Sequence, residues 1–150
     1  MKVYRIASCN YIQDLSGYGA FLNGGRWNSE GVYALYTAST ASLAMLEILA
    51  HFQIMPKVGF CLMCVDIPDN SLLDIDAQSL PQDWNLFPAP ELLQKIGDKH
   101  LREGKYLGIR FPSALLPEDK VILLNPKHKH FQYVKIDYSR AIEIDKRLYK

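Results

Sequence analysis

The sequence predicts a single α+β domain that consists mainly of strands, with two principal helices. Three observations lead to this prediction: a length of 150 residues, short apolar runs separated by turn residues, and only two segments with the boundaries of helices. A chain of this length buries roughly 70% of the surface of its unfolded form, which is enough for a hydrophobic core. No repeat, low-complexity tract or long linker interrupts it, so we expect one domain over residues 1–150.

Short strands separated by turns account for most of the chain. We expect strands at residues 2–6, 32–37, 58–67, 71–75, 106–111, 120–124, 132–137 and 141–145. Residues 14–31 contain five glycines. They predict a loop or a tightly bent strand, because glycine adopts backbone conformations that other residues avoid. Residues 76–90 contain three prolines and should be irregular.

Two segments carry the signals of helices. The first spans residues 41–52, where Ser39 or Thr40 can cap the N-terminus and a proline follows the end. The second runs over residues 91–102, with Pro90 at its first turn and a glycine just past its end. Together with the strands, these helices predict a mixed α+β class.

The charge of the chain is nearly balanced. Its 17 Lys and Arg residues and 16 Asp and Glu residues give a net charge of +1, which produces no general attraction to nucleic acid or to an anionic membrane. The segment 127–130, Lys-His-Lys-His, allows a local basic patch or a solvated turn. The first residues lack the apolar stretch of a signal peptide, and no apolar run approaches the ~20 residues that span a bilayer. We therefore expect a cytoplasmic protein without a nucleic-acid or membrane partner.

The three cysteines, Cys9, Cys61 and Cys64, are too few and odd in number for a disulfide framework. Cys61 and Cys64 have CxxC spacing, but they fall on an expected strand, where residues three apart point to opposite faces. His128 and His130 alone are a weak metal signal. The sequence therefore predicts reduced cysteines and no metal site.

Glu47 is the most unusual residue of the first expected helix. It is the only ionisable group in residues 43–50, so this helix has little polar face and should be largely buried. Leu43, Leu46 and Ala50 lie three or four positions away and share its face. A carboxylate there is costly unless it is paired, hydrogen-bonded or open to a cleft. Glu47 is therefore a functional acid, half of a structural ion pair, or the one exposed residue of the helix.

Residues 24–28, Gly-Gly-Arg-Trp-Asn, form the second candidate. Two glycines let a backbone approach a ligand closely, and Arg26 in such a bend can fork onto a phosphate or a carboxylate. The alternative is a tight turn whose arginine pairs with Glu30 or another surface acid. The segment is neither a GxGxxG dinucleotide motif nor a Walker loop.

Two further residues have a weaker signal. Tyr36 ends an expected strand and could stack on a planar ligand, although tyrosine is also an ordinary strand residue. Ser113 follows another strand, and without a GxSxG elbow it is not expected to be a hydrolase nucleophile. A hydrogen-bonding role and a simple turn serine both remain open for Ser113.

In combination, these residues resemble the RES domain, which is named for an arginine, a glutamate and a serine. The similarity extends along nearly the whole chain, and its most specific part is the 24–28 segment. The other matching fragments are residues 4–6, 17–20, 35–38, 46–47, 80–84, 97–98, 112–113 and 124–128. The sequence departs from the family at His100, where a tryptophan is usual, and at Val121 and Ile122, where Asn-Tyr is usual.

The resemblance implies an ADP-ribosyltransferase-like fold with split antiparallel β-sheets and a few flanking helices. The family's functional residues map onto Arg26, Tyr36, Glu47 and Ser113, which we expect to be catalytic. Substrate-binding residues should be Gly25, Arg26, Trp27, Asn28 and Tyr36. In this interpretation Arg26 binds pyrophosphate or a ribose oxygen, Tyr36 stacks on nicotinamide, and Glu47 stabilises a ribosyl cation. Ser113 would hydrogen-bond a ribose or an amide.

The resemblance also implies a toxin of a bacterial type II toxin–antitoxin system that arrests growth by cleaving the nicotinamide–ribose bond of NAD. The bond would be broken by hydrolysis or by phosphorolysis, with inorganic phosphate as a co-substrate and no permanently bound cofactor. The alternatives are ADP-ribosylation of a protein and a non-catalytic NAD-binding module. A nuclease toxin would need a basic groove to bind nucleic acid, and the near-neutral net charge of the chain does not favour such a groove. An Xre-like antitoxin is the implied partner, and a homodimer is left open.

Overall fold

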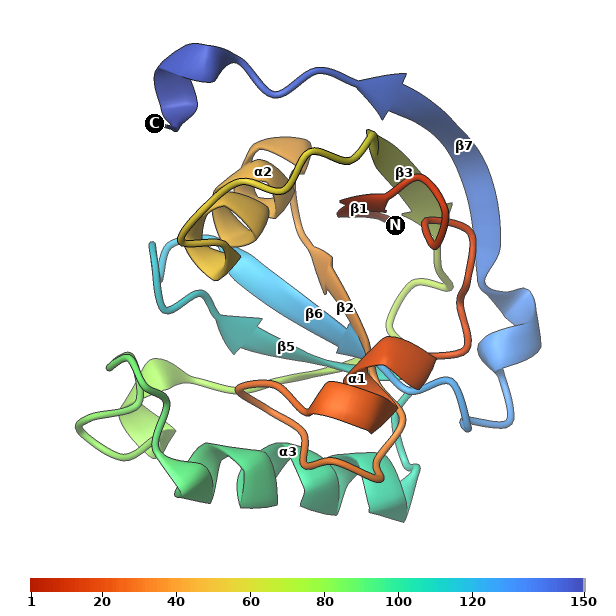
Figure 1. Ribbon diagram of the computed structural model, residues 1–150. Coiled ribbons are helices and arrows are strands. Elements are labelled where there is room, and N and C mark those ends of the chain that lie inside the picture. Colours follow the sequence, from red (N-terminus) through yellow and green to blue (C-terminus); the bar gives the residue numbers. More distant parts are fainter. Residues whose placement is uncertain (150) are drawn as a thin grey trace.

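A computed structural model describes residues 1–149 of the chain and contains a mixed but largely antiparallel sheet with three α-helices (Figure 1). The strands are β1 (Lys2–Ser8), β2 (Leu35–Ala38), β3 (Phe60–Asp66), β4 (Leu72–Asp74), β5 (Gly108–Pro112), β6 (Lys120–Leu124) and β7 (Lys135–Ile142). The α-helices are α1 (Tyr18–Asn23), α2 (Ala41–His51) and α3 (Glu91–Glu103). Short 3₁₀ helices occur at η1 (Ala77–Ser79), η2 (Phe131–Tyr133) and η3 (Lys146–Leu148).

The sheet is divided into two halves that barely touch through their backbones. Its strand order is β4-β5-β6-β2-β1-β3-β7, and only β4 and β5 run parallel. β2 pairs with β6 along its whole length, and β1 pairs with β3 over seven residues. In contrast, β1 and β2 share a single pair, Tyr4 opposite Ala38. The split antiparallel α+β arrangement is therefore as predicted, with one pair of residues as the backbone link.

Apolar side chains from both halves meet in one buried cluster. Val3 of β1 and Met63 of β3 pack in the same cluster as Ile122 and Leu124 of β6, and all four are fully buried. Burying a side chain of this size stabilises the folded state by about 1.5–3 kcal/mol. The halves are therefore held mainly by packing rather than by strand hydrogen bonds.

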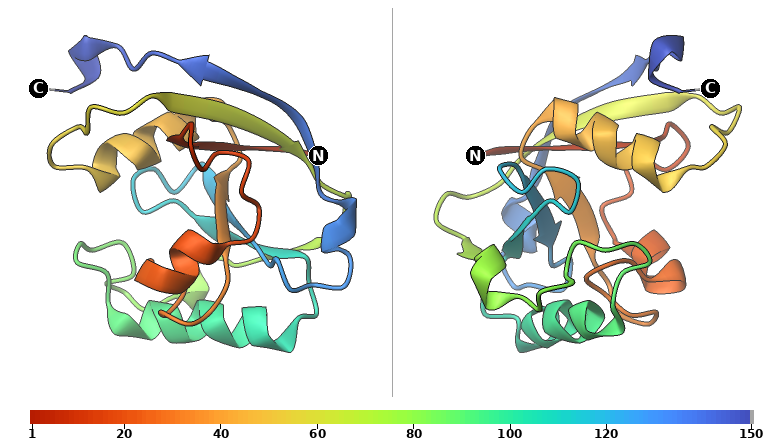
Figure 2. Two further views of the ribbon diagram at one scale, coloured as in Figure 1. Left: turned by 45° about the vertical axis from the view of Figure 1, so that its right-hand side comes forward. Right: turned by 90° about the vertical axis from the view of Figure 1, so that its left-hand side faces the viewer.

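Both predicted helices are present, with the expected caps. The side chain of Thr40, and not Ser39, caps α2 by accepting a 3.0 Å hydrogen bond from the Leu43 backbone N–H. Pro90 precedes α3, and Gly104 ends it with a φ of 63°, which glycine adopts without strain. α2 packs against β1 and β2 in the middle of the sheet, and α3 packs against β5 (Figures 1 and 2).

Residues 14–31 were expected to contain no helix, and that prediction is wrong. α1 forms there because two of the glycines, Gly17 and Gly24, lie at its ends. Gly17 precedes the helix with a φ of 75°, and Gly24 follows it with a φ of 69°. The side-chain amide of Asn23 donates to the carbonyl of Gly19 and reinforces the single turn. Glycine-rich composition here marks tight helix boundaries.

The C-terminal strands also differ from the expectation. In place of strands at 132–137 and 141–145, one strand, β7, pairs with β3 along its length. A bulge interrupts the register opposite Cys64 and Val65. A bulge adds one unpaired residue and so shifts which side chains face each side of the sheet. The alternation of apolar and polar residues is therefore interrupted, and the hydrophobic pattern did not predict one continuous strand.

The expectation of three reduced cysteines is corrected by a disulfide between Cys9 and Cys61. The antiparallel pairing of β1 with β3 places Ala7 opposite Cys61, and the Cys9 backbone N–H bonds the carbonyl of Gly59. The Cα atoms of the two cysteines are consequently only 4.9 Å apart. Cys64 is buried and free, so the CxxC pair does not act together.

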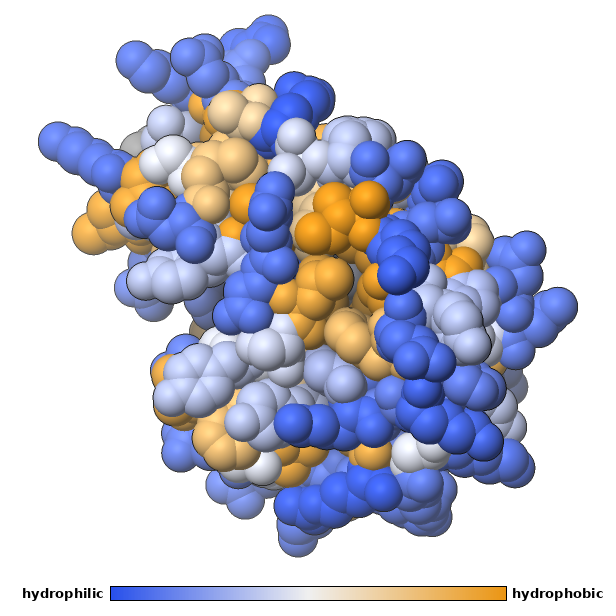
Figure 3. Space-filling view, turned by 90° about the vertical axis from the view of Figure 1, so that its right-hand side faces the viewer, coloured by the Kyte–Doolittle hydropathy of each residue, from blue (hydrophilic) through white to orange (hydrophobic). Residues whose placement is uncertain are grey.

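One face of the molecule carries apolar side chains at its centre, surrounded by hydrophilic ones (Figure 3). This face lies on the right-hand side of Figure 1. Within residues 1–149, no helix combines the length and the apolar character that a membrane crossing requires.

The packing of α3 on the sheet yields a stability prediction. Phe111 is fully buried and its ring stacks on Trp27, with the ring centroids 3.8 Å apart. Phe111→Ala should lower the free energy of unfolding by about 3–5 kcal/mol, measured by urea denaturation. Phe87→Ala is the matched control, because Phe87 is 88% exposed, and it should change stability by less than about 0.5 kcal/mol. Equal losses in the two variants would contradict the packing described here.

Candidate active site

Four segments of the chain converge on one side of the molecule. Arg26 comes from the turn after α1, Tyr36 from β2, Glu47 from α2 and Ser113 from the end of β5. Viewed from the left-hand side of Figure 1, α2, the turn after β5 and the loop before α3 border the same face (Figure 2, right). Hydrogen bonds connect Ser113 with Glu47 and Tyr36 with the turn that contains Arg26, and Glu47 lies near enough to Arg26 to influence its pKa. The four predicted residues therefore lie close together, although they are far apart in sequence.

Ser113 fixes the carboxylate of Glu47. Its hydroxyl donates a 2.8 Å hydrogen bond to Glu47 Oε1, and it is itself fully buried. Ser113 Oγ also accepts a 3.1 Å hydrogen bond from the backbone N–H of Leu115, so the turn after β5 sets the position of this hydroxyl. Within residues 1–149 no hydrogen bond reaches Glu47 Oε2. Ser113 therefore orients one carboxylate oxygen and leaves the other for a ligand.

The surroundings of Glu47 differ from the largely buried helix face that was expected. Leu43 is buried, but Leu46 is 39% exposed and Ala50 is exposed, while Glu47 itself is half-buried. α2 buries one side only, and Glu47 lies at the border between that side and solvent. No cation lies within 4.0 Å of this carboxylate in the described residues, so it is not half of a structural ion pair.

Tyr36 is held by the turn that carries Arg26. Its hydroxyl donates to Asn28 Oδ1 at 2.6 Å and accepts the Trp27 backbone N–H at 3.0 Å. Burial is the main cause that raises the pKa of Tyr36 far above its ordinary value of 10.0, and the charge of Asp98 raises it further. A Cβ at Gly25 would lie only 2.5 Å from the Tyr36 hydroxyl. Glycine at position 25 is therefore what lets Tyr36 reach the turn.

Arg26 is anchored by carbonyls rather than by a surface acid. Its Nη1 donates to the carbonyls of Trp84 and Leu86, both at 2.9 Å, and it forms no ion pair with Glu30. Burial lowers the pKa of Arg26, and the nearby charge of Glu47 opposes that shift. A guanidinium has five N–H donors, so those on Nε and Nη2 can still reach an anionic ligand.

Trp27 and Asn28 support the site from inside. Trp27 is 2% exposed and stacks on Phe111, while Asn28 is fully buried and donates to the carbonyls of Ala20 and Val32. Their side chains lie beneath the turn, so they shape it. Gly25 and Arg26, in contrast, are half-buried at the surface of the turn.

Sequence reasoning missed Gln94. On α3 it shares a face with Gly97 and Asp98, and its amide donates to the carbonyls of Gly25 and Asn28. The available signal was a pair of polar residues, four positions apart, on the face that also contains buried Leu93 and Leu101. Position 98 matched a family fragment, but no role followed from the match.

Other matched fragments support the frame. A Cβ at Gly17 would approach the backbone of Ala34 and Pro126 Cγ to 2.9 Å, so this glycine lets α1 pack closely. The Asn125 amide donates to the carbonyl of Leu101 at 2.9 Å and ties β6 to α3. Gly17 and Asn125 stabilise the fold. Matches to the family at such positions therefore need no role in the candidate site.

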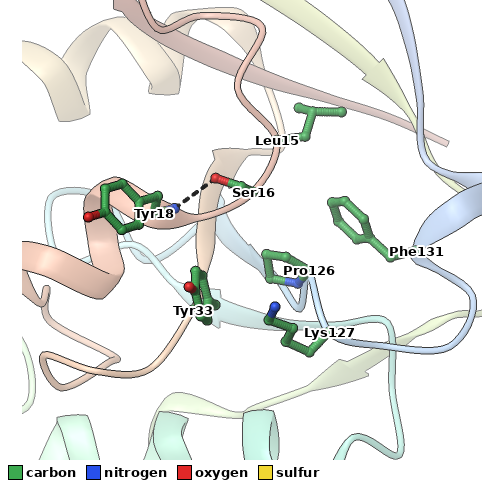
Figure 4. A pocket seen from close by; sticks show the side chains of 7 residues that line it. All are labelled: Leu15, Ser16, Tyr18, Tyr33, Pro126, Lys127 and Phe131. Atoms are coloured by element: carbon green, nitrogen blue, oxygen red, sulfur yellow. Dashed lines mark hydrogen bonds between the residues drawn. The ribbon is translucent and has the colours of Figure 1, made fainter.

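Two surface cavities lie apart from the four predicted residues. One of about 520 Å³ lies between the N-terminal end of α1 and the loop after β6, and its lining includes Tyr18, Tyr33, Lys127 and Phe131 (Figure 4). Lys127 Nζ lies 4.3 Å from the Tyr33 ring centroid. The other, of about 570 Å³, follows α2 past Leu46.

The described residues contain no group of three or more His, Cys, Asp and Glu side chains that could hold a metal ion. His128 and His130 lie together, but the Nδ1 atom of His128 accepts the His130 backbone N–H. This pair therefore stabilises the turn after β6.

The split sheet with its flanking helices defines a small α+β domain. A family model described as the RES domain matches residues 2–145. The chain therefore belongs to the RES-domain family.

Relatives support this assignment. The chain is 41% identical to "Toxin Res" of Yersinia enterocolitica over 134 residues, which cover 88% of each chain. It is 31% identical to the "Prs ADP-ribosylating toxin" of a Sphingobium species over 140 residues, or 90% of this chain and 86% of that one. The solved toxin of the Mycobacterium tuberculosis MbcT–MbcA toxin–antitoxin complex is similar in fold, with a TM-score of 0.79 and 22% identity over 94% of this chain and 83% of that chain. These likenesses agree with the predicted class, a toxin of a toxin–antitoxin system.

The Tyr36 hydroxyl network gives a prediction for stability. Tyr36→Phe leaves the Trp27 N–H and Asn28 Oδ1 without their partner in a buried site. The free energy of unfolding at pH 7 should fall by about 1–3 kcal/mol, measured by urea denaturation. Tyr11→Phe, at a tyrosine that is 66% exposed, is the control and should behave as wild type.

The raised pKa of Tyr36 gives this prediction a pH dependence. The folded protein keeps the phenol proton where the unfolded chain, with its ordinary pKa of 10.0, releases it. This stabilisation is complete below pH 10 and is lost as pH rises through the raised pKa. Wild type should lose stability above pH 10 more steeply than Tyr36→Phe, and identical slopes would show that the pKa of Tyr36 is not raised in the folded protein.

Proposed function

We propose that this toxin cleaves the bond between nicotinamide and ribose in NAD. The observation that supports this most directly is the Glu47 carboxylate, fixed by Ser113 through one oxygen and located close enough to Arg26 to influence its pKa. An anchored carboxylate and an arginine with free donors are the two groups that a cationic sugar and a pyrophosphate require.

The chemistry needs stabilisation of a positive charge. As the bond from ribose C1′ to the nicotinamide nitrogen breaks, its electron pair leaves with neutral nicotinamide, and an oxocarbenium-like ribosyl cation remains. An enzyme accelerates this step by binding the cation more strongly than the substrate. Glu47 is suited to that task because its geometry is fixed in advance by the Ser113 hydroxyl, so no reorganisation is needed during the reaction.

Arg26 and Tyr36 would hold the two ends of the reacting half of NAD. The Nε and Nη2 donors of Arg26 can fork onto a pyrophosphate or a ribose oxygen. The Tyr36 ring, held at its hydroxyl by the Arg26 turn, offers a face on which nicotinamide can stack. Because Ser113 is fully buried and donates to Glu47, it would act through Glu47 rather than on NAD.

The species that captures the cation can be water, inorganic phosphate or a protein side chain. Water gives ADP-ribose and a proton, phosphate gives a phosphorylated ADP-ribose, and a protein side chain gives an ADP-ribosylated protein. Growth arrest would follow from loss of NAD in the first two cases. A protein acceptor is a second candidate function, favoured by the relative whose name describes ADP-ribosylation.

Restraint by an antitoxin is part of the proposal. The structural neighbour was solved in a complex of toxin and antitoxin. For this chain we propose an Xre-like antitoxin that occludes the site when bound. Activity assays therefore require the chain separated from any partner.

The decisive experiment is product analysis of NAD turnover with phosphate varied. Purified protein should release nicotinamide, and the accompanying product identifies the acceptor. Transfer of label from adenylate-labelled NAD onto a protein would establish the transferase alternative. Unchanged NAD after prolonged incubation with folded protein, with and without phosphate, and no labelled protein, would reject all three reactions. Saturable NAD binding without turnover would instead support the alternative of a non-catalytic NAD-binding module.

Glu47→Gln should remove the charge that stabilises the cation and retain the shape of the side chain. We expect nicotinamide release to fall on the order of 10²–10³-fold, with an unchanged melting temperature, measured by chromatography and thermal denaturation. Glu103→Gln, at an exposed position at the end of α3, is the charge-matched control. A Glu47→Gln variant as active as this control would reject the assigned role.

Ser113→Ala tests the support of Glu47 separately. A hydrogen bond to a charged group contributes about 1.5–3 kcal/mol, so kcat should fall roughly 10–100-fold if Ser113 holds the carboxylate in its reactive position. KM for NAD should change little, because Ser113 does not contact the substrate. A large rise in KM at unchanged kcat would instead place Ser113 in direct contact with NAD.

A further inference from the structure

The polar face of α3 lies directly on the turn that contains Arg26. Gln94, Gly97 and Asp98 are spaced three and four positions apart and therefore share one helix face. The Gln94 amide donates to the carbonyl of Gly25 at 3.0 Å and to that of Asn28 at 3.1 Å. One side chain thus holds both ends of the bend that contains Arg26.

Asp98 holds the next residue of the same turn. Its carboxylate accepts the Ser29 backbone N–H at 2.9 Å and the Ser29 hydroxyl at 2.6 Å, and it is 5% exposed. In residues 1–149 no cation lies within 4.0 Å of it. A buried carboxylate is costly unless hydrogen bonds satisfy it, and the two hydrogen bonds from Ser29 do so here.

Gly97 makes this arrangement possible. A Cβ at this position would overlap the backbone carbonyl of Trp27, so any other residue would push the helix away from the turn. With glycine there, the helix backbone touches the turn, and the hydrogen bonds from Gln94 and to Asp98 can both form.

We propose that Gln94 and Asp98 are positioning residues for Arg26, which fix the backbone of residues 25–29 so that the guanidinium points to a ligand beside Glu47. The activity test of this inference rests on the proposed NAD cleavage. The guanidinium is fixed at its other end by the Trp84 and Leu86 carbonyls, both bonded to Nη1. Because the backbone of the turn and Nη1 of Arg26 are both held, the N–H donors on Nε and Nη2 keep one direction.

The kinetic test uses Asp98→Ala with NAD as substrate. Displacement of a binding group by about 1 Å can cost on the order of 100-fold in rate, so kcat/KM should fall by about that factor. Asp98→Asn should recover most of the activity, because its amide oxygen can still accept the Ser29 N–H. Lys99→Ala, at the exposed neighbour on the same helix turn, should match wild type. Equal losses in Asp98→Asn and Asp98→Ala would overturn the positioning role.

A double variant separates positioning from general stability. If Asp98 acts through Arg26, adding Asp98→Ala to Arg26→Ala should lower kcat/KM less than twofold further. Losses that multiply would show that Asp98 acts independently, and the inference would be wrong. Should Asp98→Ala fail to fold, Gln94→Met replaces it in the same cycle.

A measurement without NAD distinguishes this inference from the proposed function. Amide hydrogen exchange of Gly25 and Ser29 should accelerate at least tenfold in Asp98→Ala and Gln94→Met, while amides of β6 keep the wild-type rate. If wild type does not turn over NAD, the proposed function fails, and the exchange rates alone decide whether α3 fixes the turn. Unchanged exchange at both amides would overturn the inference whatever the activity.

Discussion

The structure depends on how its two half-sheets are joined. Tyr4 and Ala38 are the only backbone pair between β1 and β2, so the strands themselves contribute little to the joint. The shared cluster around Val3, Met63 and Ile122 therefore carries the association. Packing between layers tolerates a change of angle that a continuous ladder would not, and this allows loops and helices from both halves to face a common site.

The candidate site is built from several elements that meet through short contacts. Glu47 belongs to α2, which follows β2, while Ser113 comes directly after β5. A single hydrogen bond of 2.8 Å connects them. Tyr36 completes the link, because it lies on β2 and bonds the Arg26 turn through Asn28 and the Trp27 backbone. No single helix or strand carries all four residues, so the geometry of the site depends on how these elements pack together.

The sequence predicted the class, both long helices and most strands, because caps, prolines and apolar runs are local signals. It failed at residues 14–31, where glycines at the two ends of α1 resemble glycines in a loop. It failed at the cysteines because the Cys9–Cys61 contact depends on the pairing of β1 with β3. The four site residues were identified as a group by family resemblance, since local patterns marked Glu47 as unusual and left Arg26 ambiguous. The partners of these residues, such as Gln94, depend on tertiary contact.

One consequence follows from the place of Ser113 at the end of β5. Pro112 is paired with Lys120 of β6, so a slip of one residue in that register would turn the Ser113 hydroxyl to the opposite face. The carboxylate of Glu47 would then lose its donor. The orientation of the Glu47 carboxylate is in this way coupled to completion of the sheet.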